Sequence, residues 1–168
     1  PAGAVMTTPS TPLLGTYPTA YRQAQSSLES YQSMVGGRSE LIDPYERTLT
    51  VSAAQDLPLE ERSDDAFSVT DDLQVPFSAI SIPEKDTVTL GADNAKFPLP
   101  VESSLDSPVK VVIELEANDR VEFPQNQIEE TLEPGSTTVD IPVKTRAAGD
   151  TPVRITVRTP DDGVILAE

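Results

Sequence analysis

The sequence predicts an α+β chain, in which an immunoglobulin-like antiparallel β-sandwich is preceded by a small segment of two or three helices. Two observations predict this fold. Apolar residues recur every three or four positions before about residue 76, and every second position after residue 78. Seven short alternating segments then follow within about 90 residues, separated by turn residues, which is typical of such sandwiches. We expect a linker at 1–15, a helical segment at 16–76 and the sandwich at 78–168.

The first helix is predicted directly after the linker. Residues 1–15 are small, polar and rich in proline, which is typical of an extended arm. One face of the next stretch is apolar and consists of Tyr17, Tyr21, Ala24, Leu28, Tyr31 and Val35. Pro18 suits a first helical turn, and Gly36–Gly37 predicts the end. Tyrosines at this spacing more often pack against a core than stack on a ligand.

Two further helices are expected before residue 76. Asp43 is predicted to cap the second helix, with Pro44 at its first position. Its apolar side consists of Ile42, Tyr45, Leu49 and Ala53. The third helix is weaker, and Pro76 is predicted to end it. Its inward residues are expected to be Leu59, Ala66, Phe67, Val69 or Thr70, and Leu73.

The predicted strands are seven short segments with alternating apolar and polar residues. They are 87–90, 96–101, 108–116, 120–123, 137–144, 151–158 and 163–168. The segment 108–116 reads PVKVVIELE and is predicted to be a central strand with one face in the core. Pro98, Pro100 and Pro142 fall on outward positions and indicate exposed sheet edges, since proline has no amide hydrogen to donate.

Composition excludes several classes of function. The net charge is −16, from 28 acidic and 12 basic residues, which disfavours binding to nucleic acid or anionic lipid. The chain has no histidine and no cysteine, so triads and zinc sites built on those residues are excluded, and we expect no cofactor. No apolar run is long enough to span a bilayer. Because the chain begins at Pro1, we expect an excised piece or a mature fragment.

The remaining chemistry belongs to carboxylates. Asp161 and Asp162, together with Asp150, are weak candidates for calcium ligands, although Asp-Gly in a loop more often makes a turn. Glu114 and Glu116 share the outward face of segment 108–116, but a glycosidase would also need aromatic residues in a cleft, and the chain has no tryptophan. With Lys110, these two glutamates are our candidates for an interaction surface.

A resemblance to a known family rests on two stretches of the second half. They read SIPEKDTVTLGADNAKFPLPVESSLDSPVKVVIELE and LEPGSTTVDIPVKTRAAGDTPVRITVRTPDDGVILAE. They resemble the C-terminal region of large extracytoplasmic envelope proteins of actinobacteria, which have no assigned activity and are often encoded beside a MurJ/MviN-type lipid II flippase. The chain departs from the family at Glu102–Ser103, where Arg-Asn is common.

The resemblance implies a membrane anchor and a further strand beyond Glu168, so that the last strand here would be truncated. The chain itself would then contact the membrane only through an anchor outside it. We therefore expect a non-catalytic, extracytoplasmic module of a cell-envelope protein, with envelope partners such as a lipid II flippase or a wall-synthesis component. The alternatives are a carbohydrate- or calcium-binding sandwich of an adhesin, and an accessory domain of a larger envelope hydrolase.

Overall fold

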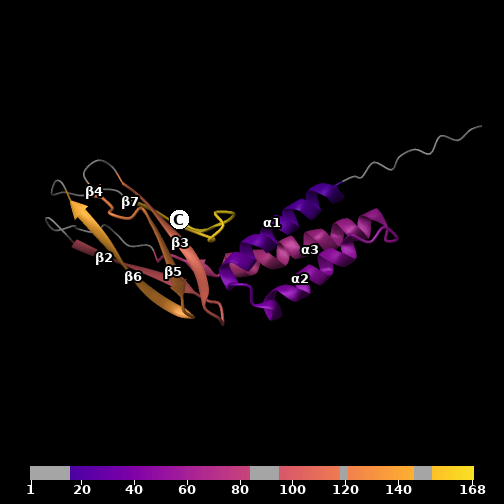
Figure 1. Ribbon diagram of the computed structural model, residues 1–168, viewed down its shortest axis with the longest axis horizontal. Helices are drawn as coiled ribbons and strands as arrows, with labels where there is room; N and C mark the ends of the chain where they lie inside the picture. The colour runs from indigo at the N-terminus through magenta and orange to yellow at the C-terminus, as the bar shows by residue number, and fades with distance from the viewer. Residues whose placement is uncertain (1–15, 84–94, 118–120, 146–152) are drawn as a thin grey trace, which may run out of the picture.

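The computed structural model describes residues 16–83, 95–117, 121–145 and 153–168. Three helices come first, and two four-stranded antiparallel sheets packed together follow. The helices lie side by side and extend from one end of the sandwich (Figure 1). The predicted fold class, α+β with an immunoglobulin-like sandwich after a helical segment, is confirmed. The predicted linker at 1–15 and the strand at 87–90 lie outside the described residues.

Helix α1 (Tyr17–Val35) follows its predicted face closely. Ala24 and Leu28 are buried, and Met34, which the predicted face omits, is 1% exposed. The helix ends where two glycines were expected to end it. Gly36 has φ +67°, and its amide donates to the carbonyl of Gln32 over 3.1 Å, which is a left-handed helix end suited to glycine.

Helix α2 (Ser39–Ser52) begins earlier than predicted. Asp43 is not its cap, and Pro44 lies inside the helix. Proline lacks only the bond to the carbonyl four residues earlier, and this loss is offset because the extra turn buries Ile42 on the same side as Leu49. The prediction for Ala53 was also wrong, since this residue follows the helix and is exposed.

Helix α3 (Leu59–Phe77) ends one residue after Pro76, close to its predicted end, although the proline itself lies inside the helix. Pro76 and Phe77 are both buried, and the ring of Phe77 lies 6.5 Å from that of Tyr31 on α1. Core contact therefore outweighs the local preference of proline. Phe67 was predicted to face inward but is 42% exposed, because Ala66 and its helical neighbours occupy the core-facing side.

The sandwich consists of two sheets. The first has the strand order β1 (Ile80–Ser81), β2 (Ala95–Ser103), β6 (Gly135–Thr145) and β4 (Val121–Glu122). The second has the order β5 (Gln127–Leu132), β3 (Val109–Ala117), β7 (Val153–Arg158) and β8 (Ile165–Ala167). Strand β3 lies between two neighbours, so its predicted central place is confirmed. Strands β1 and β5 were not predicted, and truncation of β8 stays a prediction.

The prediction of exposed edges holds for Pro98 and Pro100 among the described strands, whereas Pro142 lies on β6, between β2 and β4. Strand β2 pairs with β6 along its whole length, and Pro98 and Pro100 lie opposite Asp140 and Thr138. Among the described strands, β1 pairs only with the last two residues of β2. Both proline nitrogens point away from β6, since the ladder to β6 is continuous through them. They therefore remove donors from an edge that no described strand covers.

A single hydrophobic core runs through both parts of the chain. It joins helical residues such as Leu28, Leu73 and Phe77 to sandwich residues such as Ile113 and Leu166. The side chain of Arg38, just before α2, adds a polar link, since its Nη2 donates to the carbonyl of Pro108. The helices are therefore docked on the sandwich by shared burial.

Candidate functional site

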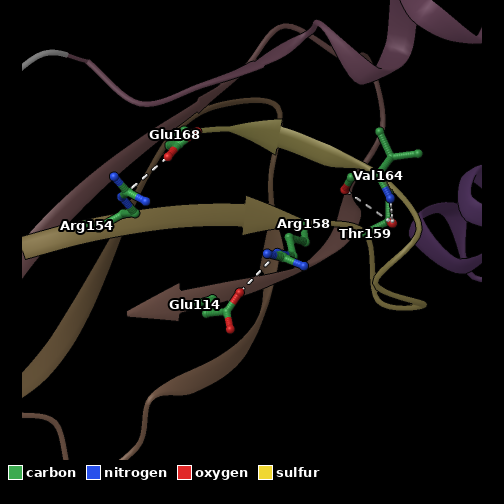
Figure 2. Close-up of polar contacts among 6 residues, drawn as sticks. All are labelled: Glu114, Arg154, Arg158, Thr159, Val164 and Glu168. Atoms are coloured by element: carbon green, nitrogen blue, oxygen red, sulfur yellow. Dashed lines mark hydrogen bonds and ion pairs between the residues drawn. The ribbon is translucent and has the colours of Figure 1, made fainter. Parts of the chain in front are cut away.

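The turn between β7 and β8 holds the described polar cluster that brings the most distant parts of the sequence together. Within it, the amide of Asp162 donates to the carbonyl of Thr159 over 3.0 Å. Figure 2 shows the second contact, in which Thr159 Oγ1 accepts from the amide of Val164 over 3.0 Å. Asp162 has φ +59°, in the left-handed region. The sequence TPDDG therefore forms a tight turn, in which aspartate tolerates the left-handed position better than most residues.

The carboxylate of Asp161 links this turn to helix α1. Its Oδ2 accepts from Ser30 Oγ over 2.8 Å, and its Oδ1 accepts from Ser33 Oγ over 3.3 Å. The same Oδ1 accepts from the amide of Gly163 over 3.2 Å. Because Ser30 is fully buried, its hydroxyl needs this acceptor.

Hydrogen bonding also sets the ionisation of Asp161. Burial alone would raise its pKa, but hydrogen bonds from Thr159, Ser30, Gly163 and Ser33 favour the charged form and hold the pKa below its ordinary value. The carboxylate therefore remains ionised at neutral pH and makes charge-assisted hydrogen bonds to α1.

The backbone of Gly163 passes close to helix α1. A Cβ built at this position would lie 2.1 Å from Ser30 Oγ and 2.8 Å from Asp161 Oδ2. Real side chains essentially never approach this closely, so any larger residue here would force Ser30, Asp161 or the helix to shift. The turn therefore packs closely against α1 at Gly163, which has no side chain, and the Asp161 carboxylate accepts hydrogen bonds from both the turn and the helix.

The three calcium candidates are in different situations. Asp161 and Asp162 are both exposed, the carboxylate of Asp161 accepts hydrogen bonds from the protein, and Asp150 lies outside the described residues. Within the described part of the chain, no group of three or more His, Cys, Asp or Glu side chains could hold a metal ion. Calcium binding at these positions stays a prediction.

The candidate interaction residues lie on the outer face of β3. Lys110 and Glu116 are exposed, while Val112 between them is 8% exposed. Glu114 is occupied, because its Oε2 lies 3.0 Å from Nε of Arg158 on β7 (Figure 2). This ion pair lacks hydrogen-bond geometry, although Arg158 Nε is fully covered. Lys110 and Glu116 are therefore the members with free outward side chains, and their role in binding stays a prediction.

The sequence did not reveal Ser30, Ser33 or Gly163 as a group. Ser30 and Asp161 are 131 positions apart, and nothing in either local pattern connects them. The only available signal was the pairing of an Asp-Gly turn with a small polar residue on an otherwise apolar helix face.

No helix in the described ranges is long and apolar enough to cross a membrane.

Comparison with known proteins gives only weak structural similarity. No protein-family model matches the sequence, and a search of curated proteins found no match. Among solved structures, the chain is similar to native alpha-2-macroglobulin from Escherichia coli, in a structure spanning domain MG7 to the C-terminus, with TM-score 0.39 and 23% identity. The match covers 49% of this chain and 14% of the macroglobulin chain. At this level the similarity says nothing about function.

Proposed function

We propose that the chain is a non-catalytic structural and interaction module of a cell-envelope protein. It acts as a rigid unit that holds a helical surface at a fixed orientation to a sandwich. The observation that supports this proposal most directly is the continuous hydrophobic core between helices and strands. The Asp161 carboxylate supports it further. It accepts hydrogen bonds from Ser30 and Ser33 of α1, so this polar cluster joins the helix to the β7–β8 turn and is not left for a ligand.

The proposal also includes an extracytoplasmic location and partners in the cell envelope. They are supported by the resemblance to actinobacterial envelope proteins, with a lipid II flippase or a wall-synthesis component as the expected partner. The calcium-binding, carbohydrate-binding and hydrolase-accessory alternatives have no described geometry in their favour. A rigid acidic module fits a partner with basic surface, since the net charge is −16.

Rigidity is tested by measuring residual dipolar couplings on the weakly aligned, isotope-labelled chain. A single alignment tensor for helices and sandwich supports the proposal. Two independent tensors would contradict it, because the two parts would then reorient separately. The Asp161→Ala variant gives the matched comparison, since it removes the polar link without touching the core.

The interaction role is tested by isolating the complete protein that contains this chain from its native envelope, after cross-linking, with mass spectrometry of the co-purifying proteins. Enrichment of a flippase or a wall-synthesis protein, lost when residues 16–168 are deleted, supports the proposal. Recovery of the same partners without these residues would overturn it.

A further inference from the structure

The exposed face of helix α3 combines apolar and acidic side chains in one stripe. Val75 is 70% exposed and Phe67 is 42% exposed, and both are among the few large hydrophobic residues at the described surface. Asp64 and Asp71 are exposed and occur at helical spacings of three and four from Phe67. We call Asp64, Phe67, Asp71 and Val75 the α3 stripe. It extends over about 16 Å, from the eleven steps of 1.5 Å between residues 64 and 75.

The charge of this stripe is not neutralised by its own helix. Helix α3 carries six acidic residues and one basic residue, Arg62. Arg62 turns away from the stripe, because its Nε donates to the carbonyl of Ser52 over 2.8 Å and its guanidinium lies 4.1 Å from the centre of the Tyr17 ring. Among the described residues, no ion pair joins Asp64 or Asp71 to a basic side chain.

These features restrict what can cover the stripe. A purely apolar partner would strip water from the two carboxylates without replacing it, which is unfavourable. A second copy of the chain would bring another strongly negative surface against it, at a net charge of −16 per chain. A segment with an apolar face flanked by lysine or arginine satisfies both requirements.

We propose that the α3 stripe is the docking surface for a cationic amphipathic helix of a partner protein. Phe67 and Val75 contact its apolar side, and Asp64 and Asp71 pair with basic residues at the edges of that side. This inference rests on the proposed interaction function and names the surface and the partner chemistry for it. Rigid docking of the helices would then serve binding, because it holds the α3 stripe at a fixed position relative to the sandwich.

The test uses the complete chain of 168 residues, isotope-labelled, and titrated with a synthetic amphipathic helix made of leucine and lysine. Amide shift changes should concentrate on α3 around residues 64–75. A peptide of the same composition in scrambled order, with no apolar face, measures binding due to charge alone. Shift changes centred on the sandwich, or equal affinity for both peptides, would overturn the proposal.

Paired variants separate apolar from electrostatic contributions. Phe67→Ser with Val75→Thr should weaken binding about tenfold, which corresponds to about 1.4 kcal/mol. The matched control, Val51→Thr with Ile165→Thr, removes exposed apolar side chains elsewhere and should leave the affinity unchanged. Equal effects of the two pairs would refute a specific apolar contact.

The charge test compares two pairs with the same change in net charge. Asp64→Asn with Asp71→Asn should weaken binding about fivefold at low salt, and Glu129→Gln with Glu133→Gln, two exposed residues of the sandwich, should weaken it less than about twofold. Equal losses would show attraction by net charge only and would overturn the inference. The envelope partners of the proposed function would still be detected in that case, so the two failures are distinguishable.

Discussion

Substitution of Gly163 by alanine tests the fit between α1 and the β7–β8 turn. The residue does not require a left-handed backbone, so the added methyl group acts only through its neighbours. It would lie 2.1 Å from Ser30 Oγ, well below the 3.0 Å under which something must shift. Ser30 has no exposed surface, so either its hydroxyl turns away from Asp161 or α1 moves.

The free-energy cost of either response can be estimated. Losing a hydrogen bond to a charged group costs about 1.5–3 kcal/mol, and overpacking a buried contact costs about 1–3 kcal/mol. We expect Gly163→Ala to lower the free energy of unfolding by about 2–3 kcal/mol. Urea unfolding followed by far-ultraviolet circular dichroism measures this value, because it reports on helices and strands together.

A double-mutant cycle with Ser30→Ala gives the decisive comparison. Removing Ser30 Oγ removes the nearest obstacle to the new methyl group and leaves only the contact with Asp161 Oδ2 at 2.8 Å, so Gly163→Ala should cost at least about 1 kcal/mol less in the Ser30→Ala background. Gly37→Ala serves as the control, because Gly37 has φ +73° and open space around its Cβ position. Its cost of about 1 kcal/mol should be the same in both backgrounds. An equal cost of Gly163→Ala with and without Ser30 Oγ would refute the proposed contact.

Three further predictions concern ionised and strained residues. Because the folded-state pKa of Asp161 is lowered, its stabilising contribution is present above the ordinary value of 3.8 and is lost as pH falls through the folded-state pKa. The destabilisation caused by Asp161→Asn, measured by urea unfolding at a series of pH values, should therefore shrink at acidic pH; a constant difference would contradict this. Glu114→Ala should destabilise by about 1 kcal/mol in urea unfolding, because it leaves the partly buried Arg158 without its partner, whereas Asp140→Ala, from an ion pair with 73% and 60% exposed side chains, should stay within about 0.5 kcal/mol. Asp162→Val should lower the thermal midpoint and cost about 1–2 kcal/mol because a β-branched residue is poorly suited to φ +59°, while Asp162→Gly should be nearly neutral; equal effects would argue against strain at this turn.

The parts of the fold that the sequence predicts are those specified by local periodicity. The face of α1 recurs at helical spacing, and alternation along β3 places Val109, Val111 and Ile113 in the core, where each is at most 2% exposed. Gly36 ends α1 because its backbone conformation is intrinsically available to glycine. These features depend on few long-range contacts, so short windows of sequence suffice to identify them.

The predictions that failed depend on tertiary contact. Pro44 was expected to begin the second helix, but α2 begins five residues earlier and buries Ile42, whereas α3 ends at the buried Phe77, one residue after Pro76. Strand β5 alternates weakly, because Glu130 stands at an inward position between Ile128 and Leu132 and only Leu132 is fully buried, so its pairing with β3 has no strong local signal. The Ser30–Asp161 contact had no local signal at all.

The edge of β2 at Pro98 and Pro100, which no described strand covers, has a consequence for how copies of this chain behave when crowded. Intermolecular strand pairing requires a run of free amide donors, and these two positions supply none on the side away from β6. Neighbouring copies are thereby discouraged from fusing their sheets through this edge, even at high local density. Association through that part of the sandwich must then depend on side chains and not on backbone hydrogen bonds. Side-chain contacts differ from partner to partner, so they can be selective.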